Sequence, residues 1–200
     1  MYGLVNQAIE DLALQLGGPD LWAQIRHGAG VEVEAFVGMQ AYPDDVTYRL
    51  VDAASVALGI PAASVLEAFG KHWILYTARN GYGPLLETMG TTLPDFLGNL
   101  DAMHARITLS MPELRPPSFV CETLPDATLT VQYWSDRDGL APMVRGLLVG
   151  LGEMFDTPVC VSQTTDRTSG ADYDEFLVAY LPDEPVVDHN VLGPSVTHAL

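Results

Sequence analysis

The sequence predicts an α+β fold, in which an N-terminal helical part packs against a small antiparallel sheet that carries one inserted helix. Three observations support this prediction. Up to about residue 110, apolar residues recur at helical spacing. Pro112, Pro116 and Pro117 then end the helical pattern. The segments that follow are short and rich in β-branched and aromatic residues, so helices precede strands, as is typical of α+β domains.

Five helices are expected in the first half, and their ends carry recognisable signals. Gly17 and Gly18 end the first helix, Asp44 or Asp45 is expected to cap the third, and Thr92 is expected to cap the last. A short turn is expected at 85–89. The predicted helices span 2–16, 19–27, about 44–58, about 61–80 and about 93–109.

Four strands and one helix are expected in the second half. The strands are predicted at 118–123, 128–134, 158–164 and 175–180, with an apolar helix at about 140–155. Residues 182–200 are interrupted by prolines and weakly patterned, so we expect one domain over 1–181 and a C-terminal tail whose composition is compatible with disorder.

The charge and composition exclude several classes of partner. Only 9 of the 200 residues are Lys or Arg and the net charge is −17, which argues against binding nucleic acid or anionic lipids. The chain shows neither a signal peptide nor an apolar run of about 18 residues, so no membrane span is expected. Two cysteines do not make a disulfide framework. We therefore expect a cytoplasmic protein, monomeric by default.

Tyr133, Ser135 and Arg137 occur at alternate positions in the segment YWSDR. In a strand, such side chains point to the same side. A phenol, a hydroxyl and a guanidinium would then converge as hydrogen-bond donors toward one anion. The alternative is an exposed strand end with a surface arginine.

His104 lies on the apolar stripe of its predicted helix, at +4 from Leu100 and +8 from Phe96. An imidazole that faces inward needs a partner for each ring nitrogen. One alternative is a core histidine bonded to a backbone carbonyl, and the other is the axial ligand of a haem iron. Haem is an apolar plate with two carboxylates, so it would also supply an anion for Tyr133, Ser135 and Arg137 to bind.

Taken together, these motifs resemble the haem nitric oxide/oxygen-binding (H-NOX) domain family, which includes the haem sensor of soluble guanylate cyclase. The resemblance covers about residues 1–181. Besides His104, it is carried by MYGLVNQAIE at the start, RPPSF at 115–119, the Y-x-S-x-R pattern at 133–137 and the GLAPMVRGLL segment that follows.

The resemblance implies a haem b site and assigns its residues. His104 would be the proximal iron ligand, and Tyr133, Ser135 and Arg137 would hold the haem propionates. Pro117 matches the proline that presses on the porphyrin and bends it. The residues at distal-pocket positions are Val5, Ile9, Trp73, Met143 and Leu147.

The resemblance also implies a gas-sensing function rather than an enzymatic one. Oxygen-binding members carry a distal tyrosine on the GLAPMVRGLL segment, and this chain has none there, so it resembles the branch selective for nitric oxide (and carbon monoxide). Trp73 has an indole N–H that leaves an oxygen-binding sensor or carrier as the alternative. A haem-free interaction module is a third hypothesis.

The resemblance further implies how a signal would leave the domain. Nitric oxide would weaken the bond to His104, the haem would relax and the helix would shift. Since 200 residues leave no room for a catalytic domain, we expect signalling in trans to a histidine kinase or a cyclic-di-GMP enzyme.

The remaining cysteines and histidines suggest no further site. Cys121 and Cys160 are expected to be small buried residues, although a redox or nitrosation role is conceivable for Cys121. His27 and His72 are expected at the surface or with satisfied ring nitrogens. No Cys or His spacing typical of a zinc site is present.

Overall fold

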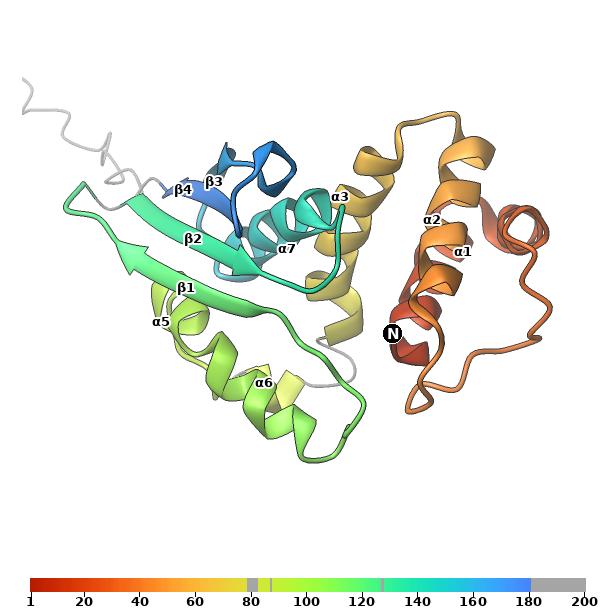
Figure 1. The fold of residues 1–200 in the computed structure, drawn as a ribbon, viewed down its shortest axis with the longest axis horizontal. Helices are drawn as coiled ribbons and strands as arrows, with labels where there is room; N and C mark the ends of the chain where they lie inside the picture. Colours follow the sequence, from red (N-terminus) through yellow and green to blue (C-terminus); the bar gives the residue numbers. More distant parts are fainter. Residues whose placement is uncertain (79–82, 87, 127, 181–200) are drawn as a thin grey trace, which may run out of the picture.

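A computed structural model of the chain describes residues 1–78, 83–86, 88–126 and 128–180. The predicted α+β class is confirmed: a helical N-terminal part lies beside a four-stranded antiparallel sheet with its own helices (Figure 1). The predicted tail at 182–200 lies outside the described residues, so its boundary stays a prediction.

The first two predicted helices form one bent helix, α1 (Gly3–Gly28). Gly18 interrupts it with a φ of 70°, a left-handed conformation that glycine adopts without a steric penalty. Pro19 then starts the second stretch, because its fixed φ suits the first turn of a helix. The predicted break at the double glycine is therefore a bend within one helix and not the end of a helix.

Helix α2 (Asp44–Leu58) begins where predicted, but its capping differs from the prediction. Pro43 is the N-cap residue, and no side chain caps the helix. The Asp44 carboxylate instead bonds the N-terminal ammonium of Met1 and the guanidinium of Arg137. Two cationic partners compete successfully with the neutral backbone amides that a cap would satisfy.

The helix predicted at 61–80 changes from an α-helix to a π-helix after about three turns. Helix α3 covers Ala62–His72, and a π-helix, η1, continues over Trp73–Ala78. A π-helix winds more widely than an α-helix and occurs often at functional sites. Residues 79 and 80 of the prediction lie outside the described residues.

The single helix predicted at 93–109 is wrong, because the chain forms two helices. They are α5 (Leu93–Gly98) and α6 (Leu100–Thr108), and Asn99 separates them with φ −100° and ψ 0°. The Asn99 side chain donates to the Asp95 carbonyl at 2.9 Å, so its amide competes with the regular helical bonds. The predicted Thr92 cap is confirmed, since its hydroxyl accepts from the Asp95 amide at 3.3 Å.

All four predicted strands are present and pair antiparallel in the order β1-β2-β4-β3. Helix α7 (Ala141–Met154) connects β2 to β3. The strands span β1 (Ser118–Thr123), β2 (Thr128–Trp134), β3 (Val159–Thr165) and β4 (Asp174–Tyr180).

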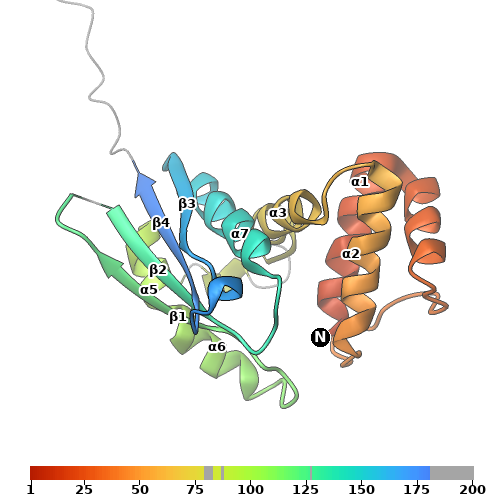
Figure 2. The same ribbon diagram turned by 45° about the horizontal axis from the view of Figure 1, so that its top comes forward.

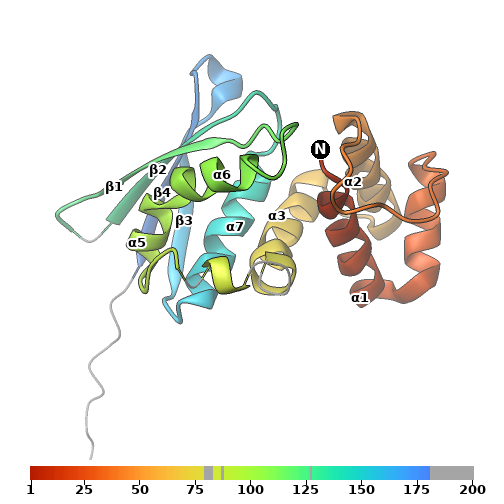
Figure 3. The ribbon, with the colours of Figure 1, turned by 90° about the horizontal axis from the view of Figure 1, so that it is seen from below.

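The helices of the second half cover one face of this sheet. Figure 3 shows α5, α6 and α7 along that face, and the turned view of Figure 2 shows α3 between α7 and the α1–α2 pair. Side chains that point to the helices are buried, such as Val131, Phe176 and Val178. Those that point away, such as Val120 and Cys160, remain exposed.

Helices α3 and α7 approach until their backbones touch. A Cβ atom at Gly70 would overlap the Met143 carbonyl oxygen, and one at Gly146 would overlap the Glu67 carbonyl oxygen. Lys71 also pairs with Glu153 across the two helices at 2.5 Å. Since backbones in contact leave little freedom, the two helices form one rigid wall.

No single helix among the described residues is long and apolar enough to cross a membrane. Helix α2 and the segment Ala62–Tyr76 reach that length only together, with a bend of 110° between them. Both bury core side chains, including Leu50, Val51 and Phe69, which accounts for their apolar composition.

Candidate functional site

A cavity of about 290 Å³ lies between the N-terminal helices and the sheet with its helices. Its volume is close to the lower end of the roughly 300–1,000 Å³ typical of small-molecule sites. The lining is largely apolar, with a few polar side chains that converge on it. The polar groups include His104, Tyr133, Ser135 and Arg137.

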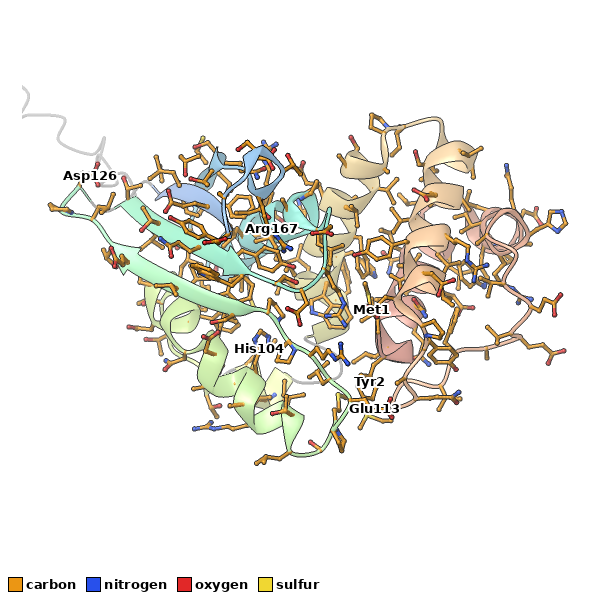
Figure 4. All side chains as sticks on the ribbon, viewed as in Figure 1. Met1, Tyr2, His104, Glu113, Asp126 and Arg167 are labelled. Carbon is orange, nitrogen blue, oxygen red and sulfur yellow. The ribbon has the colours of Figure 1, made fainter. Side chains whose placement is uncertain are left out.

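His104 is half-buried on α6 and lines the cavity (Figure 4). Its Nδ1 atom is buried and has no hydrogen-bond partner. Burial lowers the pKa of the imidazole, although the Asp101 charge and the nearby Pro117 carbonyl act in the opposite direction. That carbonyl forms no hydrogen bond of ordinary geometry with the ring. The lowered pKa favours the neutral imidazole, the form that binds metals.

Phe119 connects the His104 end of the cavity to Tyr133. Its ring centroid lies 6.1 Å from that of His104 and 5.5 Å from that of Tyr133. The sequence analysis did not single out Phe119, although strand alternation predicts that it points inward with Cys121. The apolar ring of Phe119 thus lies between the imidazole of His104 and the phenol of Tyr133, and all three residues line the cavity.

Tyr133, Ser135 and Arg137 all line the cavity, but not by strand alternation alone. Strand β2 ends at Trp134, as predicted, so Ser135 and Arg137 lie in the bend that follows, and strand alternation does not extend to them. Pairing with β4 ends at the Tyr133–Asp174 register position, which leaves the next residues without a strand partner on that side. The Arg137 amide donates to the Ser135 hydroxyl at 3.1 Å, and this bond shapes the bend.

Tyr133 remains a hydrogen-bond donor at neutral pH. Its side chain is 4% exposed, and burial raises the pKa of the phenol. The nearby Ser135 hydroxyl and the charge of Arg137 oppose this shift without reversing it. The hydroxyl therefore keeps its proton at the polar end of the cavity.

Arg137 is already engaged by protein partners. Its Nε donates to the Asp44 carboxylate at 2.7 Å, and its Nη1 donates to the Arg115 carbonyl at 2.7 Å. Burial alone would raise the pKa of Asp44, but hydrogen bonds from the N-terminal ammonium and Arg137 outweigh it, so that this pKa is lowered. A guanidinium has five N–H donors, so donors remain for a further anion. Neither Asp44 nor Arg115 was expected from the sequence as a partner of Arg137.

Five of the six predicted apolar pocket residues line the cavity. They are Val5, Trp73, Pro117, Met143 and Leu147. Ile9 is the exception, since it is 5% exposed but belongs to the core and not to the cavity lining. It lies one helical turn beyond Val5 on α1, which carries it past the end of the cavity.

The other histidines and cysteines depart from prediction at two positions. His72 is 4% exposed with an unpartnered Nε2, whereas we expected a surface or satisfied histidine. Cys160 is exposed on the outer face of β3, not buried. Cys121 is half-buried near the Leu97 carbonyl, and burial raises the pKa of its thiol to about 11. His27 is exposed, as expected.

The lining of the cavity suits an apolar ligand that carries acidic groups and one metal position. Among the described residues, no three His, Cys, Asp or Glu side chains gather as a metal site. A metal would therefore have to come with its own ligands and take one more from the protein. The unpartnered neutral His104 fits that role, and Tyr133, Ser135 and Arg137 fit the acidic groups, so the residues match a haem.

Comparisons with known proteins agree with this geometry. The family model described as HNOB, Haem-NO-binding, matches residues 2–163. Soluble guanylate cyclase gcy-35 of Caenorhabditis elegans is 34% identical over 164 residues, which cover 80% of this chain and 24% of that protein. The soluble guanylate cyclase subunit beta-2 of Rattus norvegicus is 34% identical over 121 residues, or 58% of this chain and 18% of that protein.

Solved structures show the same fold. An H-NOX protein from S. oneidensis in the Fe(II)NO ligation state superimposes with a TM-score of 0.81 at 21% identity, covering 91% of this chain and 100% of that chain. The unliganded Fe(II) H-NOX protein from K. algicida gives 0.77 at 18% identity, covering 92% and 98%. The chain spans about a quarter of the length of the guanylate cyclases that it matches.

Proposed function

Since this chain belongs to the Haem-NO-binding (H-NOX) family, whose domains are haem-based gas sensors and not catalytic domains, we propose that it binds haem b and senses nitric oxide at ferrous iron. The observation that carries the proposal is one cavity with a neutral, unpartnered His104 near one end and three anion-binding side chains at the other.

Every predicted site residue except Ile9 has a role consistent with its place. His104 would bind the iron, and Tyr133, Ser135 and Arg137 would hold the propionates. Pro117 lines the cavity near His104, where it would press on the porphyrin. When bound, the haem supplies a ferrous iron that takes up diatomic gases.

The apolar side of the cavity supports nitric oxide rather than oxygen as the ligand. Met143 and Leu147 of α7 line it, and no tyrosine does so from that helix. Bound oxygen gains from a hydrogen-bond donor worth roughly 1.5–3 kcal/mol, or about 10- to 150-fold in affinity. Nitric oxide needs no such donor, and carbon monoxide is a second candidate ligand. The related S. oneidensis protein has been solved in its NO and CO states.

Signalling would pass from His104 along α6 to a separate protein. Helix α6 is only nine residues long, and Leu109 directly after it is 86% exposed. A shift of His104 would therefore reach the surface within two turns. We take the partner to be a histidine kinase or a cyclic-di-GMP enzyme, and the sensor to be a cytoplasmic monomer whose domain spans 1–181.

An absorption spectrum of the purified protein tests the proposal. The reduced protein should show a histidine-ligated ferrous Soret band that air leaves unchanged and nitric oxide shifts. A stable oxygen complex in air would contradict the nitric oxide assignment and favour the oxygen-sensor alternative, with Trp73 as the candidate donor. Absence of any haem band after haem is supplied would reject the proposal. An unchanged partner activity with and without nitric oxide would reject signalling in trans.

A further inference from the structure

Arg167 lies outside the region that the family model matches, which ends at residue 163. It begins a short 3-10 helix, η2 (Arg167–Ser169), between β3 and β4. Figure 4 labels it near the C-terminal end of β2, where the chain leaves the sheet toward Ser135 and Arg137. The sequence analysis gave no signal for it.

The Arg167 guanidinium binds the bend that carries Ser135 and Arg137. Its Nη1 donates to the Ser135 carbonyl and, at 3.5 Å, to the Arg137 carbonyl. Its Nη2 pairs with the Asp138 carboxylate at 2.9 Å. One planar group therefore contacts three residues of the segment 135–138, which we call the clamp loop.

Arg167 is itself anchored to the sheet. Its amide donates to the Asp174 carboxylate at 3.0 Å, and the Gln163 side chain donates to the same carboxylate at 2.9 Å. Asp174 is 7% exposed and lies opposite Tyr133 in the β2–β4 register. Arg167 is therefore fixed to Asp174, the β4 residue that pairs with Tyr133 of β2.

The clamp loop needs such support because it has left the strand ladder. From the other side, α2 contributes the Tyr48 hydroxyl, which donates to the Asp138 carbonyl at 2.9 Å, and Asp44, which binds Arg137. An ion pair with Asp138 alone would contribute little, since that carboxylate is 88% exposed. The charge-assisted bonds from Arg167 to the Ser135 and Arg137 carbonyls matter more, because they hold the backbone of the clamp loop.

We infer that Arg167 is a positioning residue for the side chains that would bind the haem propionates: it holds the clamp loop so that Ser135 and Arg137 face the cavity. The inference rests on the proposed haem function. Arg167 touches no ligand in this scheme and acts only through the main chain of residues that do.

The dissociation rates of haem and of haem dimethyl ester, measured separately, distinguish this positioning role from general destabilisation. The variants are Arg167→Met and Arg167→Lys, and Arg145→Met is the matched control, since Arg145 makes only an exposed 3.7 Å pair with Glu67. With ordinary haem, R167M should release haem about 10-fold faster, which equals about 1.4 kcal/mol, with R167K between it and the wild type. With haem dimethyl ester, which lacks propionate charges, R167M should differ from the wild type by less than about twofold. R145M should match the wild type with both haems.

A double-mutant cycle tests the route through Arg137. If Arg167 acts by positioning Arg137 and its loop, R137M/R167M should release haem little faster than R137M alone. Additive effects, or equal acceleration with haem and its dimethyl ester, would overturn the inference.

A measurement on the apo protein keeps the inference separable from the proposed function. Amide hydrogen exchange across 135–138 should be faster in R167M than in the wild type and unchanged in R145M. Unchanged exchange in R167M, or unchanged haem release, overturns the inference and leaves the haem function intact. A wild-type protein that takes up no haem rejects the function, and the positioning role with it.

Discussion

The two ends of the cavity are prepared for a ligand in opposite ways. At one end, the Nδ1 atom of His104 is buried without any partner. At the other end, Arg137 already binds Asp44 and the Arg115 carbonyl, and Arg167 holds its loop. A buried group without a partner needs an explanation, and at His104, which lines the cavity, a ligand can supply one. A group that is already paired, such as Arg137, is held in place by the protein before the ligand binds, so less conformational entropy is lost on binding.

The largest expected effect is at the unpartnered end. His104→Gly should remove the histidine-ligated Soret band and weaken haem binding by more than about 100-fold, because loss of a mere supporting residue already costs 10- to 100-fold. Added imidazole should restore the band by occupying the vacated position. Retention of the original spectrum in H104G would show that another residue ligates the iron.

The next effect tests the contact between α3 and α7, which both line the cavity. Gly146→Ala places a Cβ against the Glu67 carbonyl and should lower the free energy of unfolding by about 2–4 kcal/mol, measured by urea denaturation. Gly98→Ala is the control, since nothing lies within 4 Å of a Cβ there. Equal stability of the two variants would contradict a backbone contact between the helices.

His72 offers a second buried histidine outside the cavity lining for comparison with His104. Burial lowers the pKa of His72, partly offset by Asp11, so the folded state favours its neutral form. Its contribution is therefore fully present above the unfolded pKa of about 6.5 and is lost as pH falls below that value.

Between pH 7.5 and 5.5, the wild type should lose more unfolding free energy than His72→Leu, because protonation of His72 favours the unfolded chain. Urea titrations at several pH values measure this difference. His27→Ala, which alters an exposed histidine, should follow the wild-type pH profile. If the unfolding free energy of H72L changes with pH as that of the wild type does, His72 has the same pKa in the folded and unfolded states.

The smallest effect is expected at the partnered end. The pKa of Asp44 is lowered, so its contribution is present above the unfolded value of about 3.9 and disappears as pH falls through the folded value. Asp44→Asn should cost less than about 1 kcal/mol at pH 7, because the carboxylate is 40% exposed, and the cost should vanish in acid.

Asp45→Asn is the matched control for Asp44, since Asp45 makes only an exposed i,i+4 pair with Arg49. A pH-independent loss in D44N would mean that the interaction is not ionic.

Much of this protein could be predicted from local pattern. The apolar stripe around His104, the proline boundary at 112–117 and the alternation in the strands identified the fold class and the elements. Asn99 shows the limit of pattern, since one side-chain amide divided a helix whose apolar periodicity continued through it.

The sequence by itself determined the α+β class, the strands, most of the helices and the residues at the two ends of the candidate site, because periodicity and residue chemistry are local properties. The tertiary structure alone decided the partners: Asp44 beside Arg137, Arg167 under the clamp loop, and Ile9 beyond the cavity. Asp44 and Arg137 lie 93 residues apart. Such contacts depend on how α2, β2 and the β3–β4 connection meet in space, and no periodic signal along the chain encodes that meeting.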